Sequence, residues 1–216
     1  MTYPPAKFAS TDRADAVQIA RATRFASLTA VQDGALLTVH LPLTLVGEAE
    51  GEAGSEARFV GHLLRSNPFF AAMEAGPVAA RAVFLPAQGY VSPSVYAEKA
   101  ASGKVVPTWN YVAAHLDGTM ALGAPEDLAA TLEAQAEDYE GATGSDWKVA
   151  DAPTDFVAGL ARAIAGFAFT ATAFQAIRKL SQNRPEADRA AVTGWLAQTR
   201  PASGAIDWWM ARQGEG

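Results

Sequence analysis

The most informative segment of the chain reads Val106-Pro107-Thr108-Trp109-Asn110-Tyr111-Val112-Ala113-Ala114-His115, and it opens a long apolar run that ends at Leu122. A run this apolar, with aromatic and β-branched residues, predicts a strand over residues 109–122. On a strand, Trp109 and Tyr111 share one face while Asn110 lies on the other. The aromatic face suits stacking against a flat ring, and it suits packing in a barrel core or a dimer seam equally well.

Turn and cap signals on either side of this segment predict the other elements. Gln32-Asp33-Gly34 is a hairpin turn between strands at 25–31 and 35–46, and the small acidic stretch 47–57 is a surface loop. Asn67 caps a short helix that has Pro68 in its first turn, and Thr154 caps a later helix. Further strands are expected at 58–64, 78–85 and 166–177, and further helices at 10–23, 124–139, 154–164, 185–199 and 205–213.

This order of elements predicts a mainly β protein with added helices (α+β). About six antiparallel strands in meander order, with helices inserted at the edges, are typical of a small closed barrel. We expect one domain over 1–216, with a helical insert at about 124–165 and C-terminal helices at about 185–213. The sequence has no Gly-x-Gly-x-x-Gly after a strand and no Walker sequence, which argues against a Rossmann or P-loop nucleotide site.

Composition narrows the class of protein further. The chain has 216 residues, of which 50% are hydrophobic, so it can bury a sizeable core. It contains no cysteine, no signal-peptide pattern and no apolar run near the ~20 residues that span a bilayer, so we expect a cytoplasmic protein that does not enter a membrane. Its net charge of −6 does not support DNA binding, which would require a local basic patch or an indirect role.

The three histidines, His40, His62 and His115, do not have the spacing of a metal site. We therefore expect no metal. The Gly-x-Ser-x-Gly elbow of many serine hydrolases is also absent. No acid–base residue stands out, although His115 and Tyr111 are candidates.

Three further segments carry polar groups at the ends of predicted strands. In Gly61–Pro68, a strand gives way to a helix at Arg65 and Ser66, which suits a phosphate and equally suits simple helix capping. In Gly89–Tyr96, hydroxyl groups flank a turn and either face a polar ligand or cap a helix. The basic, amide-rich segment Arg178–Pro185 suits a phosphate or the polar rim of a heterocycle, and it also suits a solvated loop.

Together these segments resemble the PaiB-type family of FMN-binding negative transcriptional regulators. The most specific blocks are Pro107-Thr108-Trp109-Asn110-Tyr111 and Lys179-Leu180-Ser181-Gln182-Asn183. They are joined, in family order, by Thr38–Leu43, Gly61–Pro68 and Tyr90–Ser94, so the resemblance covers nearly the whole chain. The chain differs from the family pattern mainly at packing positions, such as Phe69-Phe70, where a tryptophan is usual.

The resemblance implies an antiparallel FMN-binding split β-barrel of the pyridoxamine-phosphate-oxidase-like group, with C-terminal helices. It also implies a homodimer with two FMN sites at the interface. The FMN phosphate would lie against Arg65, Ser66 and Asn67, helped by the strand that carries Thr38 and His40. The flavin ring would meet Trp109, Asn110, Ser92 and Ser94, and the site would be closed by Lys179, Ser181 and Gln182.

The implied function is that of a flavin-binding regulator that lowers the expression of target genes. The alternative is an FMN-dependent oxidoreductase that acts on a small molecule, since FMN itself carries redox chemistry. The sequence does not decide whether the chain is an enzyme.

Overall fold

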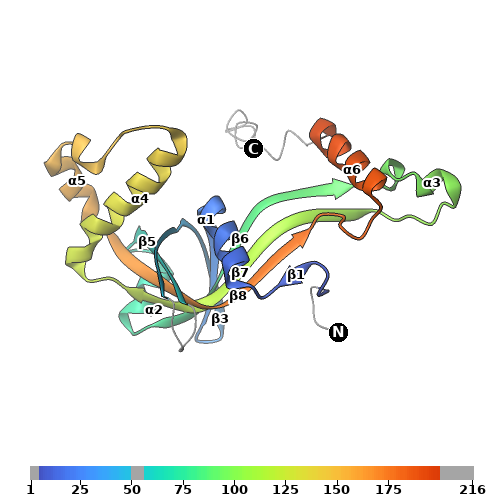
Figure 1. Cartoon of the computed structure of the whole chain (residues 1–216). Coiled ribbons are helices and arrows are strands. Elements are labelled where there is room, and N and C mark those ends of the chain that lie inside the picture. Colours follow the sequence, from blue (N-terminus) through green and yellow to red (C-terminus); the bar gives the residue numbers. More distant parts are fainter. Residues whose placement is uncertain (1–4, 50–55, 200–216) are drawn as a thin grey trace, which may run out of the picture. The chain divides into compact units, whose positions relative to one another are not determined.

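Figure 1 shows the computed structural model, which describes residues 5–49 and 56–199. The chain divides into two compact units. We call Ala9–Pro86 with Ala113–Ile177 the large unit, and the described residues 5–8, 87–112 and 178–199 the small unit. Each unit is described by itself below.

The described residues contain an eight-stranded sheet in the order β3-β2-β6-β7-β8-β5-β4, with the short β1 paired to β8. All strand pairs with a determined register are antiparallel. The expected antiparallel α+β fold is therefore confirmed. The strands are β1 (Ala9–Ser10), β2 (Phe25–Gln32), β3 (Ala35–Pro42), β4 (Thr44–Ala49), β5 (Glu56–Leu64), β6 (Val78–Val91), β7 (Thr108–Leu122) and β8 (Ile164–Lys179).

The hairpin of β2 and β3 forms as its turn residues predict. Asp33 and Gly34 both have positive φ, 51° and 79°, which is the backbone twist that a two-residue hairpin needs. The register then pairs Gln32 with Ala35 directly across the turn. The turn therefore fixes which side chains of both strands face the core.

The strand expected at 35–46 is broken in the structure. The buried Leu43 separates β3 from β4, and its backbone N–H donates to the carbonyl oxygen of Arg24 at 2.7 Å instead of continuing the strand. Because β3 and β4 lie at opposite ends of the strand order, this single residue links the two outer strands of the sheet. The sheet must curl for that link to be made, as a barrel requires.

Phenylalanine rings form the centre of the large unit. Phe59, Phe84 and Phe169 are fully buried, and the ring centroid of Phe59 lies 6.0 Å from that of Phe84 and 6.4 Å from that of Phe169. The strand β7 also passes very close to β8 at Gly118. A Cβ at Gly118 would lie 2.1 Å from the carbonyl oxygen of Thr170, so only glycine fits there.

The expected caps form at α1 and α2 but not at α5. Asp12 caps α1 by accepting from the N–H of Ala14, and Asn67 caps α2 by accepting from the N–H of Phe69. The expected cap at Thr154 is wrong, because Pro153 occupies the cap position without a side-chain bond and Thr154 is the first helical residue. The helices are α1 (Arg13–Thr23), α2 (Pro68–Glu74), α3 (Glu98–Ala101), α4 (Leu128–Thr143), α5 (Thr154–Ala161) and α6 (Glu186–Thr199).

Several expected boundaries differ from the structure. The helices expected at 124–139 and 154–164 are α4 and α5, and the strand expected at 166–177 is the longer β8. The strand expected at 78–85 continues as β6 through Pro86 to Val91, with residues 85–88 exposed, so a proline there removes no buried hydrogen bond. The acidic loop expected at 47–57 is shorter at both ends, because Gly47 belongs to β4 and Glu56 to β5. Its middle, 50–55, and the helix expected at 205–213 lie outside the described residues.

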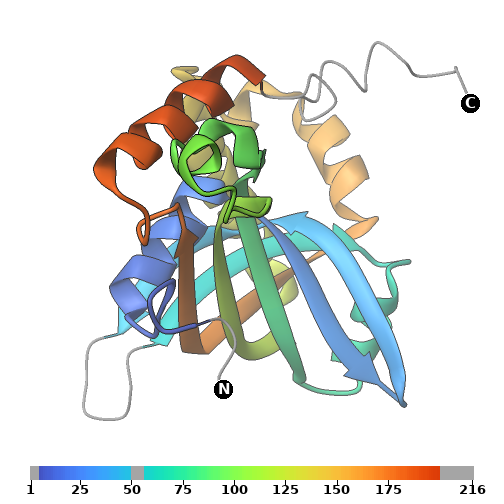
Figure 2. The same ribbon diagram turned by 90° about the vertical axis from the view of Figure 1, so that its right-hand side faces the viewer.

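A small core holds the small unit together. The buried side chains of Val91, Tyr96 and Val192 pack with Leu196 of α6. At Gly89 a Cβ would lie 2.9 Å from Cδ2 of Leu196, so the missing side chain lets α6 approach β6 closely. Figure 2 shows α6 beside the short helix α3.

Candidate functional site

A cavity of about 230 Å³ opens in the small unit between the start of β7 and the loop after β8. We call it the cationic cavity, because its wall carries lysine and arginine side chains. It is lined by Lys7, Phe8, Tyr96, Val106, Pro107, Thr108, Asn110, Lys179, Ser181, Asn183 and Arg184.

The charge of the wall is positive. Lys7, Lys179 and Arg184 line the cavity, and no carboxylate occurs among the lining residues in the described part of the chain. The ammonium group of Lys179 donates to the hydroxyl of Thr108 at 2.7 Å, and this neutral acceptor does not compensate its charge. The guanidinium of Arg184 lies 4.5 Å from the ring centroid of Tyr96, a stacked position that leaves its planar N–H edge for a ligand. The cavity therefore favours an anion.

Two buried polar side chains form the floor of the cationic cavity. Asn110 is 6% exposed and Ser181 is 5% exposed. The Asn110 amide donates to Oγ of Ser181 at 2.9 Å, and the hydroxyl is 3.2 Å from Oδ1 of Asn110. Ser181 also has a φ of +62°, a left-handed conformation that costs a non-glycine residue roughly 1–2 kcal/mol. Strain of this kind concentrates at functional sites.

Gln182 fixes the loop that carries Ser181. Its side-chain oxygen accepts from the N–H of Leu180 at 2.8 Å, and its amide donates to the carbonyl oxygens of Lys7 and Arg178. The amide of Gln182 thus ties the N-terminal segment to the loop after β8, which brings Lys7 to the cavity wall. In the structure, Gln182 acts as a brace for the residues that line the cavity.

The opposite face of β7 carries an aromatic surface. Trp109 is 53% exposed, and its ring meets that of Tyr90 edge-on, with centroids 6.1 Å apart. Tyr90 in turn lies 6.3 Å from Trp195 of α6. Trp109 and Asn110 point to opposite faces of the strand. A flat ring that stacks on Trp109 therefore cannot also stack on Asn110.

Ser92 and Ser94 lie together at the end of β6. The Ser92 hydroxyl accepts from the N–H of Ser94 at 3.2 Å and lies 2.7 Å from the Ser94 hydroxyl. This bond caps the short 3-10 helix Pro93–Val95. Both hydroxyls therefore have a local structural partner.

Arg65, Ser66 and Asn67 form the turn between β5 and α2 in the large unit. Asn67 uses its side-chain oxygen to cap α2, at 3.0 Å from the N–H of Phe69. The guanidinium of Arg65 lies 5.1 Å from the ring centroid of Phe70. The turn keeps the arginine close to the start of the helix, and the proposed phosphate contact stays a prediction.

Thr38 and His40 lie on one face of β3, where each meets a hydroxyl of β2. The hydroxyls of Thr38 and Thr29 are 3.2 Å apart, and Nδ1 of His40 is 2.8 Å from the hydroxyl of Ser27. The register continues from Thr29 to Arg81 on β6. A row of hydroxyl groups therefore leads across the sheet to an arginine.

Arg81 belongs to a charged group on the large unit. Its guanidinium donates to both carboxylate oxygens of Asp117, at 2.6 and 2.7 Å, and this bond holds the pKa of Asp117 below its usual value. Burial, and then the charge of Arg81, lower the pKa of the neighbouring His115, although a hydrogen bond to Gln175 opposes the shift. His115 therefore favours its neutral form.

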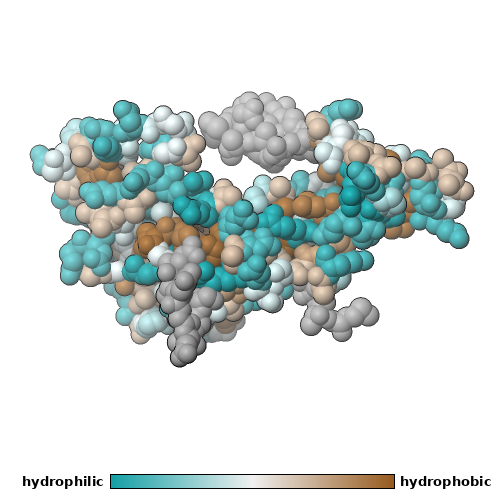
Figure 3. All heavy atoms as spheres, in the orientation of Figure 1, coloured by the Kyte–Doolittle hydropathy of each residue, from teal (hydrophilic) through white to brown (hydrophobic). Residues whose placement is uncertain are grey.

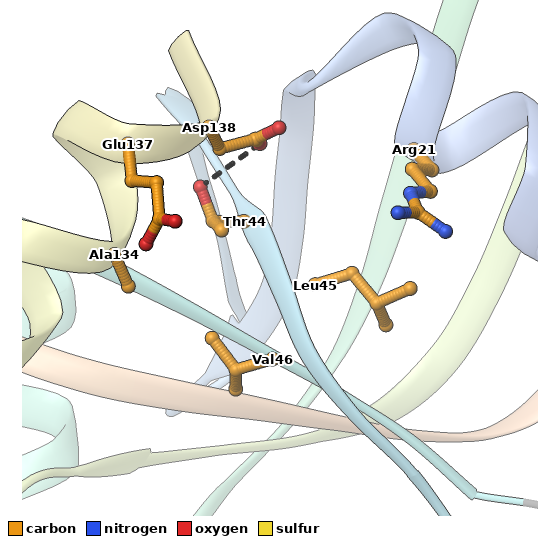
Figure 4. Close-up of a pocket in the computed structure, with 7 residues that line it drawn as sticks. All are labelled: Arg21, Thr44, Leu45, Val46, Ala134, Glu137 and Asp138. Carbon is orange, nitrogen blue, oxygen red and sulfur yellow. Dashed lines mark hydrogen bonds between the residues drawn. The ribbon is translucent and has the colours of Figure 1, made fainter. Parts of the chain in front are cut away.

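A second cavity, of about 240 Å³, lies in the large unit between α1, α4 and β4 (Figure 4). Asp138 accepts from Thr44 at 3.3 Å and from Nε of Arg24 at 2.9 Å. Arg21 and the carboxylates of α4 enter from opposite sides, as Figure 4 shows. Arg21 and Arg24 balance the charges of Glu137 and Asp138. The ion pair of Arg24 with Asp138 holds α4 against the barrel.

His40 and His62 of the large unit have different hydrogen-bond partners. His62 donates through Nδ1 to the buried Gln135 at 2.6 Å, whereas His40 bonds to Ser27. Within residues 5–49 and 56–199, no group of three or more His, Asp or Glu is placed to hold a metal ion. The expectation that the chain has no metal stays a prediction.

The structure brings together some of the residues that the sequence singled out. Asn110, Lys179 and Ser181 meet at the cationic cavity, and Gln182 braces it. Sequence reasoning missed Lys7, for which no local signal exists, since a backbone bond to Gln182 brings it there. Arg184 was also missed as a site residue, although it lies in the basic segment after β8 that the sequence had singled out.

Comparison with known protein families now identifies the chain's relatives. Residues 2–173 match the family described as "Putative FMN-binding domain". The chain belongs to this FMN-binding family. It is 28% identical to the protease synthase and sporulation protein PAI 2 of Bacillus subtilis over 189 residues, which are 86% of this chain and 84% of that protein. The PaiB-type resemblance is thereby confirmed.

A second relative matches over a shorter stretch. The chain is 36% identical over 115 residues to an uncharacterised protein of Emericella nidulans, which is 48% of this chain. The chain thus covers only 46% of the length of that relative.

Solved structures agree with the fold. The FAD and heme binding protein of Mycobacterium smegmatis has a TM-score of 0.57 at 18% identity, covering 87% of this chain and 80% of that one. The flavocytochrome Anf3 of Azotobacter vinelandii has a TM-score of 0.55 at 15% identity, covering 88% and 78%. At these identities the likeness shows the split-barrel fold alone.

FMN is the cofactor of this chain as a member of its family. The residues present fit the group: a phosphate needs cations and donors, a flavin ring needs a flat wall, and its carbonyls need amide donors. The chain offers a cation in Arg65 of the turn before α2, and a flat wall in the exposed ring of Trp109. Separately, none of the described helices has the length and apolar character needed to cross a bilayer.

Proposed function

We propose that the chain is a homodimeric, cytoplasmic FMN-binding regulator of the PaiB type that lowers the expression of its target genes. The observation that carries the proposal furthest is the match of residues 2–173 to the FMN-binding family. Family membership supplies the cofactor and the relative in Bacillus subtilis supports the PaiB type.

FMN would be held by the two groups of residues that the resemblance implies. The phosphate would be bound by Arg65, Ser66 and Asn67, with Thr38 and His40 as further polar groups. The ring would lie against the exposed face of Trp109, with polar contacts from Asn110, Ser92 and Ser94. The site would be closed by Lys179, Ser181 and Gln182.

The dimer would use the outer face of the β2–β3 hairpin. Phe25 is 55% exposed, and Val31 and Leu36, which are paired across the hairpin, are 64% and 75% exposed. Val31 and Leu36 lie side by side, and contiguous exposed apolar patches on a sheet face can form an interface. Figure 3 shows one face of the molecule, which is mainly hydrophilic and carries hydrophobic residues in separate groups.

Absorbance and mass test the cofactor and the dimer together. Purified protein titrated with FMN should show a shifted flavin spectrum and a raised unfolding temperature, because a ligand of the native state stabilises it. Light scattering should give twice the mass of a 22.6 kDa chain, and Leu36→Asp should halve it. A colourless monomer that FMN does not stabilise would overturn the proposal.

Regulation requires contact with DNA or with a DNA-binding partner. The net charge of −6 disfavours direct binding, because phosphate neutralisation dominates the affinity of proteins for duplex DNA. A mobility-shift titration with promoter DNA at near-physiological salt separates the cases. No shift at micromolar protein would remove direct repression and leave a partner protein as the route.

The second candidate function is an FMN-dependent oxidoreductase of a small molecule. The cationic cavity favours it, because it offers a substrate-sized space lined in part by Asn110. When bound, FMN would supply the redox chemistry, and the chain would orient the substrate. Bleaching of the flavin absorbance by NADH or NADPH, followed by reoxidation when a substrate is added, would favour this reading over regulation.

A further inference from the structure

The cationic cavity has two kinds of wall. Lys7, Lys179 and Arg184 supply positive charge, while Phe8, Val106 and Pro107 supply apolar surface. Its volume of about 230 Å³ is below the roughly 300–1,000 Å³ of sites that enclose drug-sized ligands. A whole FMN molecule therefore does not fit inside, whereas a small amphiphilic anion does.

The cations are arranged for direct contact with an oxyanion. Lys179 has three ammonium donors and gives one to the hydroxyl of Thr108, so the others can reach a ligand. Arg184 is held flat against Tyr96, which directs its N–H groups sideways. Because the chain as a whole carries −6, this positive patch is a local reversal of its field, and such reversals concentrate anions.

The apolar wall decides what kind of anion is favoured. The phosphate of FMN is attached to a ribityl chain whose hydroxyls need polar partners, and burying them against Phe8, Val106 and Pro107 would leave those hydroxyls without hydrogen bonds. A carboxylate on a hydrocarbon or aromatic body instead matches both walls at once. Asn110 and Ser181, already bonded to each other, form a floor that a ligand need not desolvate further.

We propose that the cationic cavity binds a small organic carboxylate with an apolar body, as a ligand separate from FMN. Lys179 and Arg184 bind the carboxylate, Lys7 adds charge at the mouth, and the apolar wall holds the body. The position of this ligand beside the flavin rests on the proposed function, whereas the anion site itself does not.

Calorimetric titration with benzoate and its neutral isostere benzamide tests the proposal. Benzoate should bind at one saturable site, and benzamide at least tenfold more weakly. Lys179→Met should weaken benzoate binding by about tenfold to a hundredfold, which is the effect of losing a charge-assisted bond. Lys99→Met, an exposed lysine of α3 away from the cavity, is the matched control and should change the affinity less than twofold.

A second variant guards against misfolding. Lys7 is exposed, so Lys7→Met should leave the unfolding temperature unchanged and still weaken benzoate binding severalfold. Equal affinity for benzoate and benzamide, or wild-type affinity in both lysine variants, would overturn the proposal. Tighter binding of inorganic phosphate than of benzoate would overturn the role of the apolar wall.

Flavin fluorescence titrations separate this ligand from the phosphate of FMN. With a separate ligand, benzoate binds both FMN-loaded and FMN-free protein, and Lys179→Met changes the ratio of FMN to riboflavin affinity little. If benzoate and FMN exclude each other and Lys179→Met weakens FMN but not riboflavin, the cavity holds the FMN phosphate and the proposal falls. If benzoate binds but neither flavin does, the proposed function fails while the anion site stands.

Discussion

The two units of this chain are stabilised in different ways. The large unit buries whole aromatic rings, with Phe59, Phe84 and Phe169 inaccessible to solvent. Among its described residues, the small unit has a core cluster of Val91, Tyr96 and Val192, and it buries the polar pair Asn110 and Ser181 at a cavity lined by three cations. Apolar burial gives a rigid scaffold, whereas polar groups near the surface give binding. The smaller core therefore accompanies the cavity that is lined by cations.

The largest effect should come from the core of the large unit. Phe169→Ala should lower the free energy of unfolding by about 3–5 kcal/mol, because it removes a buried ring and leaves a cavity. Val192→Ala in the small unit removes two methyl groups and should cost about 1.5 kcal/mol. Urea denaturation measures both, and equal losses would contradict the contrast between the units.

The phosphate contact in the large unit is the next largest. Arg65→Ala should weaken FMN binding by about 1.5–3 kcal/mol, because a charge-assisted hydrogen bond is lost. Arg58→Ala, which changes an exposed arginine on the preceding strand β5, is the control and should bind FMN as the wild type does. Flavin fluorescence gives both affinities, and an unchanged value for Arg65→Ala removes the residue from the site.

The polar floor of the small unit should respond to loss of one hydroxyl. Ser181→Ala leaves the buried Asn110 amide without its partner, which should cost about 1–3 kcal/mol of unfolding free energy. Ser181→Gly loses the same bond but relieves the positive φ, so it should cost less than the alanine variant. Thermal unfolding of the two variants side by side provides the measurement; the reverse order would show that the backbone at Ser181 is not strained.

The smallest effect concerns His115 in the large unit. Its pKa is lowered in the folded protein, so between that pKa and the unfolded value of 6.5 the unfolded chain binds more protons. The free energy of unfolding should therefore fall as the pH drops below about 6.5. Urea denaturation at pH 7.5 and 5.0 should show a larger loss for the wild type than for His115→Gln, and identical losses would contradict the burial of this ring.

Local signals predicted much of the fold. The strand over 109–122 is β7 almost to the residue, because apolar residues continue on both sides of Asp117-Gly118, and Asp33-Gly34 placed the hairpin. The break at Leu43 could not be read from the sequence. It depends on a bond to the backbone of Arg24 and on the closing of the sheet, both of which are tertiary.

The candidate site was predictable only in its parts. The sequence singled out Asn110, Lys179 and Ser181 separately, but their meeting requires that β7 and β8 be neighbours in the sheet. Lys7 joins them through the side chain of Gln182, a contact 175 positions apart along the chain. Spacing rules describe neighbours on one element, so an assembly of three distant segments lies beyond them.

The close passage of β7 over β8 at Gly118 offers a way to sort related sequences. A relative with any larger residue at that position cannot keep the two strands at this separation, since even one carbon would collide with the carbonyl of Thr170. Its barrel would have to widen locally. The residue at this position of an aligned relative therefore predicts its barrel geometry before any crystal structure is solved. Relatives with glycine can have the same strand separation, and relatives with any other residue cannot.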